Sequence, residues 1–340
     1  MSFVKNAWYV AGWAPSEDVR LFSRTILGKS IVFFRKTNDQ WSAIENVCPH
    51  RFAPLDKGKV VGDTLQCGYH GLRFDEHGIC VHNPIGNGRI PKAAKVDSYP
   101  VIEKYKLIWV WTGDKEAADP AKIPDYSILE DEGWVHATGG YLHCNANYQL
   151  LIDNLLDLSH VAFLHPLLGN EGMSGGKLDL QETDTTIQSN FFMAEIDSPP
   201  FYAPRYKEGS KVDNWLNMKW HAPSSLLLDF GVTDVGKSRD VGLQGIATHI
   251  LTPETDGTVH YFYSVGWPTE EDAAANVEQH HEMQGKIFST EDKPMLEECQ
   301  KNMGTTDLWD LNPVLLSGDA AAVRARRFIG RMLAQEAIEP

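Results

Sequence analysis

The sequence predicts an α+β protein with two domains. We expect a small antiparallel β domain over residues 1–120 and a larger domain over residues 121–340 that combines an antiparallel sheet with helices. The chain's 340 residues exceed the usual size of a single domain. Segments rich in β-branched and aromatic residues dominate the first hundred positions and recur between residues 176 and 266. Helical patterns flank that second group of strands.

The composition limits the classes of function. The chain is 42% hydrophobic and 23% charged, so it can form sizeable cores. Its net charge of −15 argues against nucleic acid or an anionic membrane as a partner. No apolar run is long enough for a transmembrane helix, and the N-terminus lacks the pattern of a signal peptide. We therefore expect a cytoplasmic protein with no membrane or nucleic-acid partner. The five cysteines do not resemble a disulfide framework.

The first domain begins with a series of short strands. The segments NAWYVAGW, RTILG, SIVFFRK and WSAIENV, within residues 6–47, are rich in β-branched and aromatic residues. The polar stretch KTNDQ between two of them is typical of a hairpin connection. The β domain continues through LIWVWTGD, and the connector at residues 118–124 places the domain boundary near residue 120.

Two loops in this domain each offer one cysteine and one histidine. Cys48 and His50 form a C-x-H pattern, and after sixteen residues Cys67 and His70 form a C-x2-H pattern. Two cysteines and two histidines could close a structural zinc site. Zinc fingers, however, usually group the cysteines together and the histidines together. The arrangement here favours a two-iron cluster in which the cysteines bind one iron and the histidines bind the other.

A second metal motif lies in the segment LLIDNLLDLSHVAFLH, residues 150–165. On a helix, Asn154, Asp157 and His160 would share one face because they follow one another at three-residue spacing. His165 would lie out of phase, so both imidazoles reach one metal only if the helix distorts or ends between them. Pro166 disfavours helical geometry there. Two imidazoles and a carboxylate form a typical non-haem Fe(II) site, whereas the alternative is a buried amphipathic helix with two incidental histidines.

The rest of the chain predicts a sheet followed by helices. Five strand-like segments in the region of residues 176–266 indicate a curved antiparallel sheet. Residues 270–303 predict a helix that is interrupted near Pro294. Residues 319–338 predict a final amphipathic helix.

At this point the sequence resembles a known family. CPHRFAPL and CGYHGLRFD are similar to the cluster loops of Rieske non-haem iron oxygenases, and NLLDLSHVAFLH is similar to the same family's mononuclear iron motif. Within that family the chain looks most like the aromatic O-demethylase oxygenases of the vanillate and dicamba type. The resemblance implies an N-terminal Rieske domain and a helix-grip catalytic domain. It also implies a [2Fe–2S] cluster on Cys48, His50, Cys67 and His70, and a mononuclear Fe(II) on His160 and His165.

The resemblance also suggests the third iron ligand and an electron path. The family's carboxylate falls in the segment STEDKPMLEECQ, where Asp292 is our candidate and Glu291 is its nearest rival. The family's Asp at the position of Asp157 links a cluster histidine of a neighbouring subunit to an iron histidine. By this resemblance, His70 of one chain and Asp157 and His160 of the next form the path, and the protein is a homotrimer. Asn154 is placed near the iron, where it orients oxygen or water or serves only in packing.

The expected activity follows from the same family. We expect the oxygenase component of a multicomponent monooxygenase that removes a methyl group from a methoxylated, benzoate-like aromatic compound with O₂ and releases formaldehyde. Methyl-group hydroxylation of an arene such as an arylsulfonate, or N-demethylation, is the alternative, and a zinc-binding protein without activity is a remote one. No G-x-G-x-x-G fingerprint occurs. NAD(P)H is thus expected to act through a separate flavin reductase or ferredoxin. The candidate substrate-binding residues are His249, which matches a position that contacts a carboxylate in dicamba-type proteins, Asp229 and Phe288.

Overall fold

A computed structural model describes residues 3–207 and 209–338 of the chain. They form two compact units. One unit spans Lys5–Ile123, and the other contains the chain from Pro124 onward together with the residues before Lys5. The α+β fold class expected from the sequence is confirmed, because the first unit is built from antiparallel sheets and the second combines one antiparallel sheet with helices. No helix in the described ranges is long and apolar enough to cross a membrane.

The first unit contains three small antiparallel sheets. The first has the order β1-β11-β10, the second β2-β3-β4-β9 and the third β5-β6-β7-β8. Their bounds are β1 Trp8–Trp13, β2 Leu21–Ile26, β3 Lys29–Arg35, β4 Trp41–Glu45, β5 Lys59–Val61, β6 Thr64–Gln66, β7 Arg73–Phe74, β8 Cys80–His82, β9 Ser98–Tyr99, β10 Val101–Lys104 and β11 Leu107–Trp111. Each predicted strand segment lies in this set, as the β-branched and aromatic content requires.

The two Cys/His loops are held by the core of this unit. Cys48 follows β4, and Cys67 lies between β6 and β7. Both thiols are buried in one apolar cluster with Leu55, Leu65 and Phe74. The loops are therefore fixed from beneath by packed side chains, while their tips remain at the surface of the unit.

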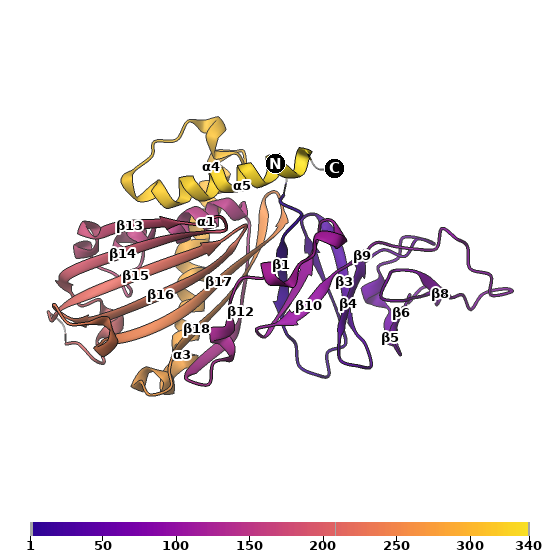
Figure 1. Cartoon of the computed structure of the whole chain (residues 1–340), viewed down its shortest axis with the longest axis horizontal. Helices are drawn as coiled ribbons and strands as arrows, with labels where there is room; N and C mark the ends of the chain where they lie inside the picture. Colours follow the sequence, from indigo (N-terminus) through magenta and orange to yellow (C-terminus); the bar gives the residue numbers. More distant parts are fainter. Residues whose placement is uncertain (1–2, 208, 339–340) are drawn as a thin grey trace. The chain divides into compact units, whose positions relative to one another are not determined.

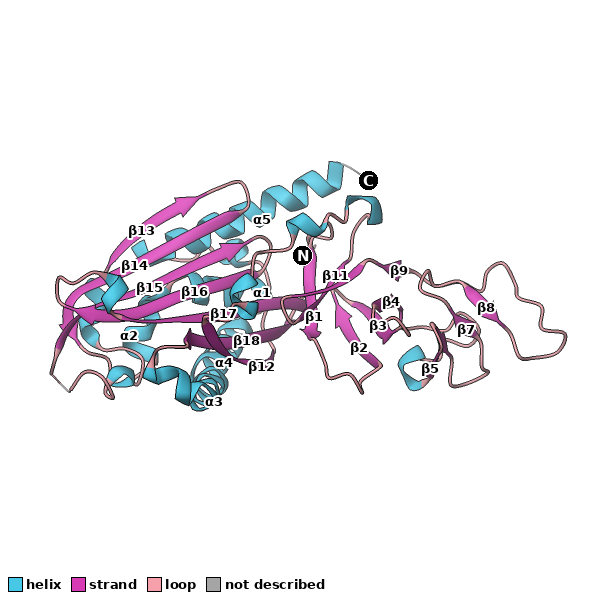
Figure 2. Cartoon of the chain, turned by 60° about the horizontal axis from the view of Figure 1, so that its bottom comes forward, coloured by secondary structure: helices cyan, strands magenta, loops and turns pink. Residues whose placement is uncertain are grey.

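The second unit is built on one seven-stranded antiparallel sheet with the order β12-β18-β17-β16-β15-β14-β13 (Figure 1). Its strands are β12 Trp134–Cys144, β13 Lys177–Glu182, β14 Thr186–Asp197, β15 Lys211–His221, β16 Ser225–Asp234, β17 Leu243–Thr255 and β18 Thr258–Pro268. Figure 2 shows β13 to β16 running side by side. Alternate residues of a strand face opposite sides of a sheet, so neighbouring residues of one strand contribute to different faces.

The helices of this unit break at the positions that carry the metal motif. α1 spans Tyr148–Leu156, a 3₁₀ turn covers Leu158–His160, and the short α2 covers Val161–Leu164. The helix thus ends at Asp157, before the first histidine, whereas the sequence allowed for a break only between the two histidines. Asp157 explains the end, since its carboxylate caps the 3₁₀ turn by accepting from the backbone N–H of Ser159 at 3.0 Å.

A second interruption lies in the helix predicted over residues 270–303. α3 spans Val277–Ile287, a π-helical turn covers Phe288–Asp292, and α4 spans Lys293–Met303. Pro294 lies in the first turn of α4, where a missing N–H costs nothing. The interruption therefore precedes Pro294, and the π turn carries both candidate carboxylates of the iron site.

The last helix, α5 at Ala320–Ile338, is joined to α1 by a buried ion pair. Arg326 donates from Nε to both carboxylate oxygens of Asp153 at 2.9 Å, and from Nη2 to Oδ2 at 2.6 Å. Its Nη1 donates to Gln149 Oε1 at 3.2 Å. The C-terminal helix is thus fastened to the helix that leads into the metal motif.

Candidate metal centres and active-site pocket

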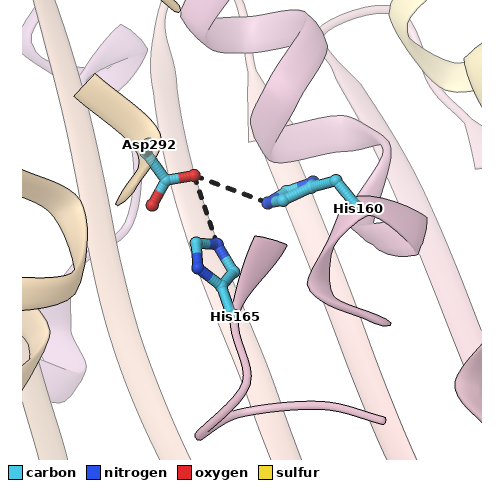
Figure 3. Close-up of side chains that lie close together, drawn as sticks. All are labelled: His160, His165 and Asp292. Atoms are coloured by element: carbon cyan, nitrogen blue, oxygen red, sulfur yellow. Dashed lines mark ion pairs between the residues drawn. The ribbon is translucent and has the colours of Figure 1, made fainter. Parts of the chain in front are cut away.

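Three predicted ligands converge in the second unit. Asp292 Oδ1 lies 3.5 Å from His160 Nε2 and 3.2 Å from His165 Nε2. Figure 3 shows both imidazoles pointing at the same carboxylate oxygen. Within the described part of the chain, this is the one group of three or more such side chains whose donor atoms all lie within 4.8 Å of one another. Asp292 and His165 are buried, and His160 is partly buried.

The outer nitrogens of both imidazoles have acceptors. His160 Nδ1 lies 2.7 Å from the backbone carbonyl oxygen of Asp157, and His165 Nδ1 lies 2.7 Å from Glu291 Oε2. An imidazole that donates from Nδ1 keeps a lone pair on Nε2. Both Nε2 atoms are therefore set up to bind a metal, and Glu291 orients His165 from behind while its neighbour Asp292 faces the front.

The donor set fits a divalent cation such as Fe(II). The other carboxylate oxygen of Asp292, Oδ2, is buried and has no hydrogen-bond partner among the described residues. Although burial alone would raise the pKa of Asp292, the two imidazoles lower it well below its ordinary value. This buried carboxylate has one oxygen without a partner and faces two imidazole lone pairs. A bound cation would interact favourably with all of these groups. Three protein ligands also leave coordination positions open.

Asn154 and Asp157 surround this centre in different ways. Asn154 Nδ2 lies 3.4 Å from Asp292 Oδ1 and 3.5 Å from His160 Nε2, so the amide is at the edge of the ligand set. Asp157 contacts His160 through its backbone carbonyl rather than through its carboxylate. The carboxylate instead lies against the backbone of Gly318, where an added Cβ would come within 2.6 Å of Oδ2.

The four Cys/His residues of the first unit also gather at one place. The rings of His50 and His70 have centroids 4.5 Å apart. Burial, together with the neighbouring Cys67 thiol, raises the pKa of Cys48 to about 11, and this shift is opposed by the backbone N–H groups of His50 and Arg51. Buried sulfurs that are approached by backbone donors suit thiolates bound to a metal cluster.

The four Cys and His donor atoms do not converge on a single ion position in the described part of the chain. Tetrahedral zinc holds its donor atoms about 3.3–3.8 Å apart, given Zn–N distances near 2.0 Å and Zn–S distances near 2.3 Å. In the described ranges, no three of the four donor atoms form a group within 4.8 Å. A two-iron cluster places the two thiolates on one iron and the two imidazoles on the other, so it needs only pairs of close donor atoms. The aromatic side chains next to the ligands, Phe52 and Tyr69, are 78% and 66% exposed.

A largely apolar pocket opens beside His160, His165 and Asp292. It is lined by the triad and Asn154, by His249 and Phe288, and by apolar residues of the sheet that include Leu216, Met218, Leu228, Phe230, Ala247 and Val265. Phe288 stacks on Tyr261 with ring centroids 5.4 Å apart and lies 5.5 Å from the ring of His249. Two of the three predicted substrate residues therefore lie in the pocket.

Asp229 lies elsewhere. It occupies β16 between two pocket residues, Leu228 and Phe230, so the strand pleat turns it to the opposite face of the sheet. There its carboxylate accepts hydrogen bonds from Trp215 Nε1 at 3.0 Å and Gln244 Nε2 at 3.1 Å, and it pairs with Arg239. Asp229 is a structural carboxylate of that face, and the structure does not bring it to the pocket.

The sequence reasoning missed several polar residues of the pocket. Tyr261, His280, Gln284 and Cys144 line it. Tyr261 lies on the same face of the sheet as His249, and Gln284 lies four residues before Phe288 on one helix face. Neither relation identifies a pocket residue until the inward-facing side of the strand and of the helix is known.

Comparisons with known proteins agree with this geometry. Residues 8–100 match the Rieske [2Fe-2S] domain, and residues 144–335 match the vanillate O-demethylase oxygenase C-terminal domain. The chain is 38% identical to the oxygenase component of chloroacetanilide N-alkylformylase from Rhizorhabdus wittichii, over 96% of this chain and 94% of the relative. It is 35% identical to the oxygenase component of dicamba O-demethylase from Stenotrophomonas maltophilia, over 99% and 100%. The crystal structure of dicamba monooxygenase bound to 3,6-dichlorosalicylic acid superposes with a TM-score of 0.91 at 34% identity, over 99% of both chains.

Proposed function

The chain belongs to the Rieske non-haem iron oxygenases with a vanillate O-demethylase-type catalytic domain, and from this premise we propose that it is the oxygenase component that removes the methyl group of a methoxylated aromatic compound. The observation that carries the proposal is the position of the triad in the wall of an apolar pocket. A hydrophobic ring can be held there with one substituent at the metal.

The protein's own residues have defined tasks in this proposal. His160, His165 and Asp292 would hold the iron, and Cys48, His50, Cys67 and His70 would hold the cluster. The bound iron would supply oxygen activation, and the cluster would supply electrons. The backbone carbonyl of Asp157 and the carboxylate of Glu291 keep the two imidazoles in the required tautomer. The apolar lining excludes water from the reacting bond.

The overall reaction balances with an external donor of electrons. One O₂, two electrons and two protons convert the aryl methyl ether to a hemiacetal and water, and the hemiacetal collapses to a phenol and formaldehyde. We propose that the electrons come from NAD(P)H through a separate reductase, since relatives are named as oxygenase components of larger systems.

The electron path is proposed to run between copies of the chain. The exposed rings of Phe52 and Tyr69 lie next to the cluster ligands and suit burial against a neighbour. We propose that His70 of one copy approaches Asp157 of the next, in a homotrimer closed by head-to-tail contacts. Asp157→Asn should then retain both metals and lose turnover. Asp184→Asn, in an exposed turn, is the matched control. Normal turnover in the first variant would remove Asp157 from the path.

N-dealkylation is the second candidate. The relative named chloroacetanilide N-alkylformylase is 38% identical to this chain. Hydroxylation of a carbon next to nitrogen gives a carbinolamine, which collapses as the hemiacetal does. The same pocket and metal set serve both reactions, so the substrate's heteroatom is the only chemical difference.

A single-turnover experiment separates these reactions. Chemically reduced protein, with both metal centres confirmed, is mixed with O₂ and a panel of aryl methyl ethers, N-methylanilides and methylarenes. Formaldehyde with a phenol establishes O-demethylation, and formaldehyde with a dealkylated amide establishes N-dealkylation. A hydroxymethyl product without formaldehyde would refute both and assign methyl hydroxylation.

A further inference from the structure

The pocket contains almost no charge apart from the iron site. Its two charged lining residues are Asp292, which belongs to the triad, and Lys293. The Lys293 ammonium is directed towards Glu297, with Nζ 3.9 Å from Oε1. A substrate carboxylate would therefore find no unpaired cationic side chain among the described residues of the lining.

His249 presents one polar atom to this pocket. Its side chain is buried, only 3% of the residue is exposed, and Nε2 has no hydrogen-bond partner among the described residues. On the other side of the ring, Nδ1 lies 2.6 Å from the hydroxyl of Tyr261. We assign the hydroxyl proton to this contact, because the Tyr261 hydroxyl has no other hydrogen-bond partner in the described part of the chain. A neutral imidazole that accepts at Nδ1 carries its own proton on Nε2. His249 is thus a hydrogen-bond donor towards the pocket.

Gln284 presents the complementary atom. Its Nε2 points at the backbone carbonyl of Ser264 at 3.5 Å, which orients the amide, and its Oε1 is buried without a partner among the described residues. Gln284 lies one helical turn before Phe288, whose ring contacts His249, and Ser264 follows Tyr263, the cross-strand partner of His249. Both His249 and Gln284 therefore lie beside Phe288 in the lining of the pocket.

Both groups are uncharged near neutral pH. Burial lowers the pKa of His249 to about 4, although the nearby Asp292 opposes the shift. Burial also lowers the pKa of His280, whose Nδ1 is a further buried atom without a partner. A carboxylate placed here would lose its hydration for one neutral donor and would face the oxygen of Gln284. A neutral group with its own acceptor and donor would satisfy both atoms.

We propose that His249 and Gln284 together recognise an uncharged head group that carries both a hydrogen-bond acceptor and a donor, such as a carboxamide or a secondary anilide. The inference rests on the proposed dealkylation, because it names the substrate class of that pocket. It replaces the benzoate-like head group expected from the sequence.

The test measures binding without turnover. The anaerobic holoprotein is titrated by calorimetry with the three positional isomers of methoxybenzamide, with the matching methoxybenzoates, and with methoxybenzene as a reference without a head group. We expect at least one benzamide to bind ten-fold or more tightly than both its benzoate and methoxybenzene. Tighter binding of every benzoate, with uptake of one proton, would show that His249 becomes a charged anion receptor and would overturn the proposal. Equal binding of all three classes would overturn it as well.

Two variants locate the recognition. Gln284→Leu and His249→Phe should each reduce the ratio of benzamide to methoxybenzene affinity about five- to ten-fold, the effect of one neutral hydrogen bond. Gln181→Leu, on the exposed surface of β13, is the matched control and should leave the ratio unchanged. An unchanged ratio in Gln284→Leu would refute the role of that residue. Because the titrations are anaerobic, their outcome is independent of whether formaldehyde is released, so failure of this inference is distinct from failure of the proposed reaction.

Discussion

Replacement of Arg326 by Met should destabilise the catalytic unit strongly. The guanidinium makes three hydrogen bonds to Asp153 and one to Gln149, and its side chain is 3% exposed. Methionine fills similar space but leaves the Asp153 carboxylate without its cation. Removing one partner of a buried ion pair costs about 3–5 kcal/mol. Because the Asp153 side chain keeps 19% exposure, water partly compensates, and we expect about 3 kcal/mol.

The loss of stability in Arg326→Met should be smaller at low pH than at neutral pH. Burial raises the pKa of Asp153 from its ordinary 3.8 to about 6, although Arg326 opposes the shift. Because the folded-state pKa of Asp153 lies above its unfolded value, the contribution of this carboxyl to stability is greatest at low pH. That contribution is lost as the pH rises through the folded pKa. Removing the arginine raises that pKa further. The penalty of Arg326→Met should therefore shrink when the pH is lowered from 7 to 5.

Urea unfolding followed by circular dichroism tests this reasoning. Arg327 is the matched control, because it is the next residue on α5 and is exposed, so Arg327→Met should change stability by less than about 0.5 kcal/mol. The double variant Asp153→Asn with Arg326→Met should recover much of the loss and show little pH dependence between 5 and 7. An equal loss of stability in Arg326→Met and Arg327→Met, or a double variant as unstable as Arg326→Met, would contradict this role of the ion pair.

Three further predictions concern the metal site. Asp292→Ala should abolish mononuclear iron, measured by metal analysis, while the visible absorbance of the cluster remains, and iron retained at both centres would contradict its role as a ligand. Glu291→Gln should weaken iron binding about 10–100-fold without abolishing it, the usual cost of losing a partner behind a ligating histidine, and chelator competition measures the change. Gly318→Ala should displace the Asp157 carboxylate, because the new Cβ would lie within 2.6 Å of Oδ2. Reoxidation of the reduced cluster during single turnover should slow, and an unchanged rate would show that this contact has no part in electron transfer.

The sequence predicted the features that depend on local chemistry. The Cys/His spacing at residues 48–70 and the two histidines of the 150–165 segment require only the residues themselves, and the strand composition was sufficient for the fold class. The sequence could not decide whether Glu291 or Asp292 faces the metal position, because two adjacent carboxylates look alike in sequence. The π turn directs Asp292 to the Nε2 side of His165 and Glu291 to its Nδ1 side, and only tertiary structure shows this.

The pocket could not be assigned from sequence for a related reason. The alternation of side chains along β16 predicts that Asp229 and its neighbours face opposite sides of the sheet. It does not predict which of these sides faces the pocket. Gln284 and His249 lie on a helix and a strand that are distant in sequence. Their common position in the pocket lining arises from the packing of α3 against the sheet, which no local pattern encodes.

The π turn at Phe288–Asp292 also constrains how this protein can evolve. It places an extra residue in an otherwise continuous helical path, and the residues beyond it are out of step with α3 by that one position. Losing a single residue there would restore a regular helix and remove the wide turn that presents Asp292 and Glu291 to opposite nitrogens of His165. A change of length in this stretch would therefore act directly on the candidate metal site. Its exact number of residues is as much a part of the active site as the ligands themselves.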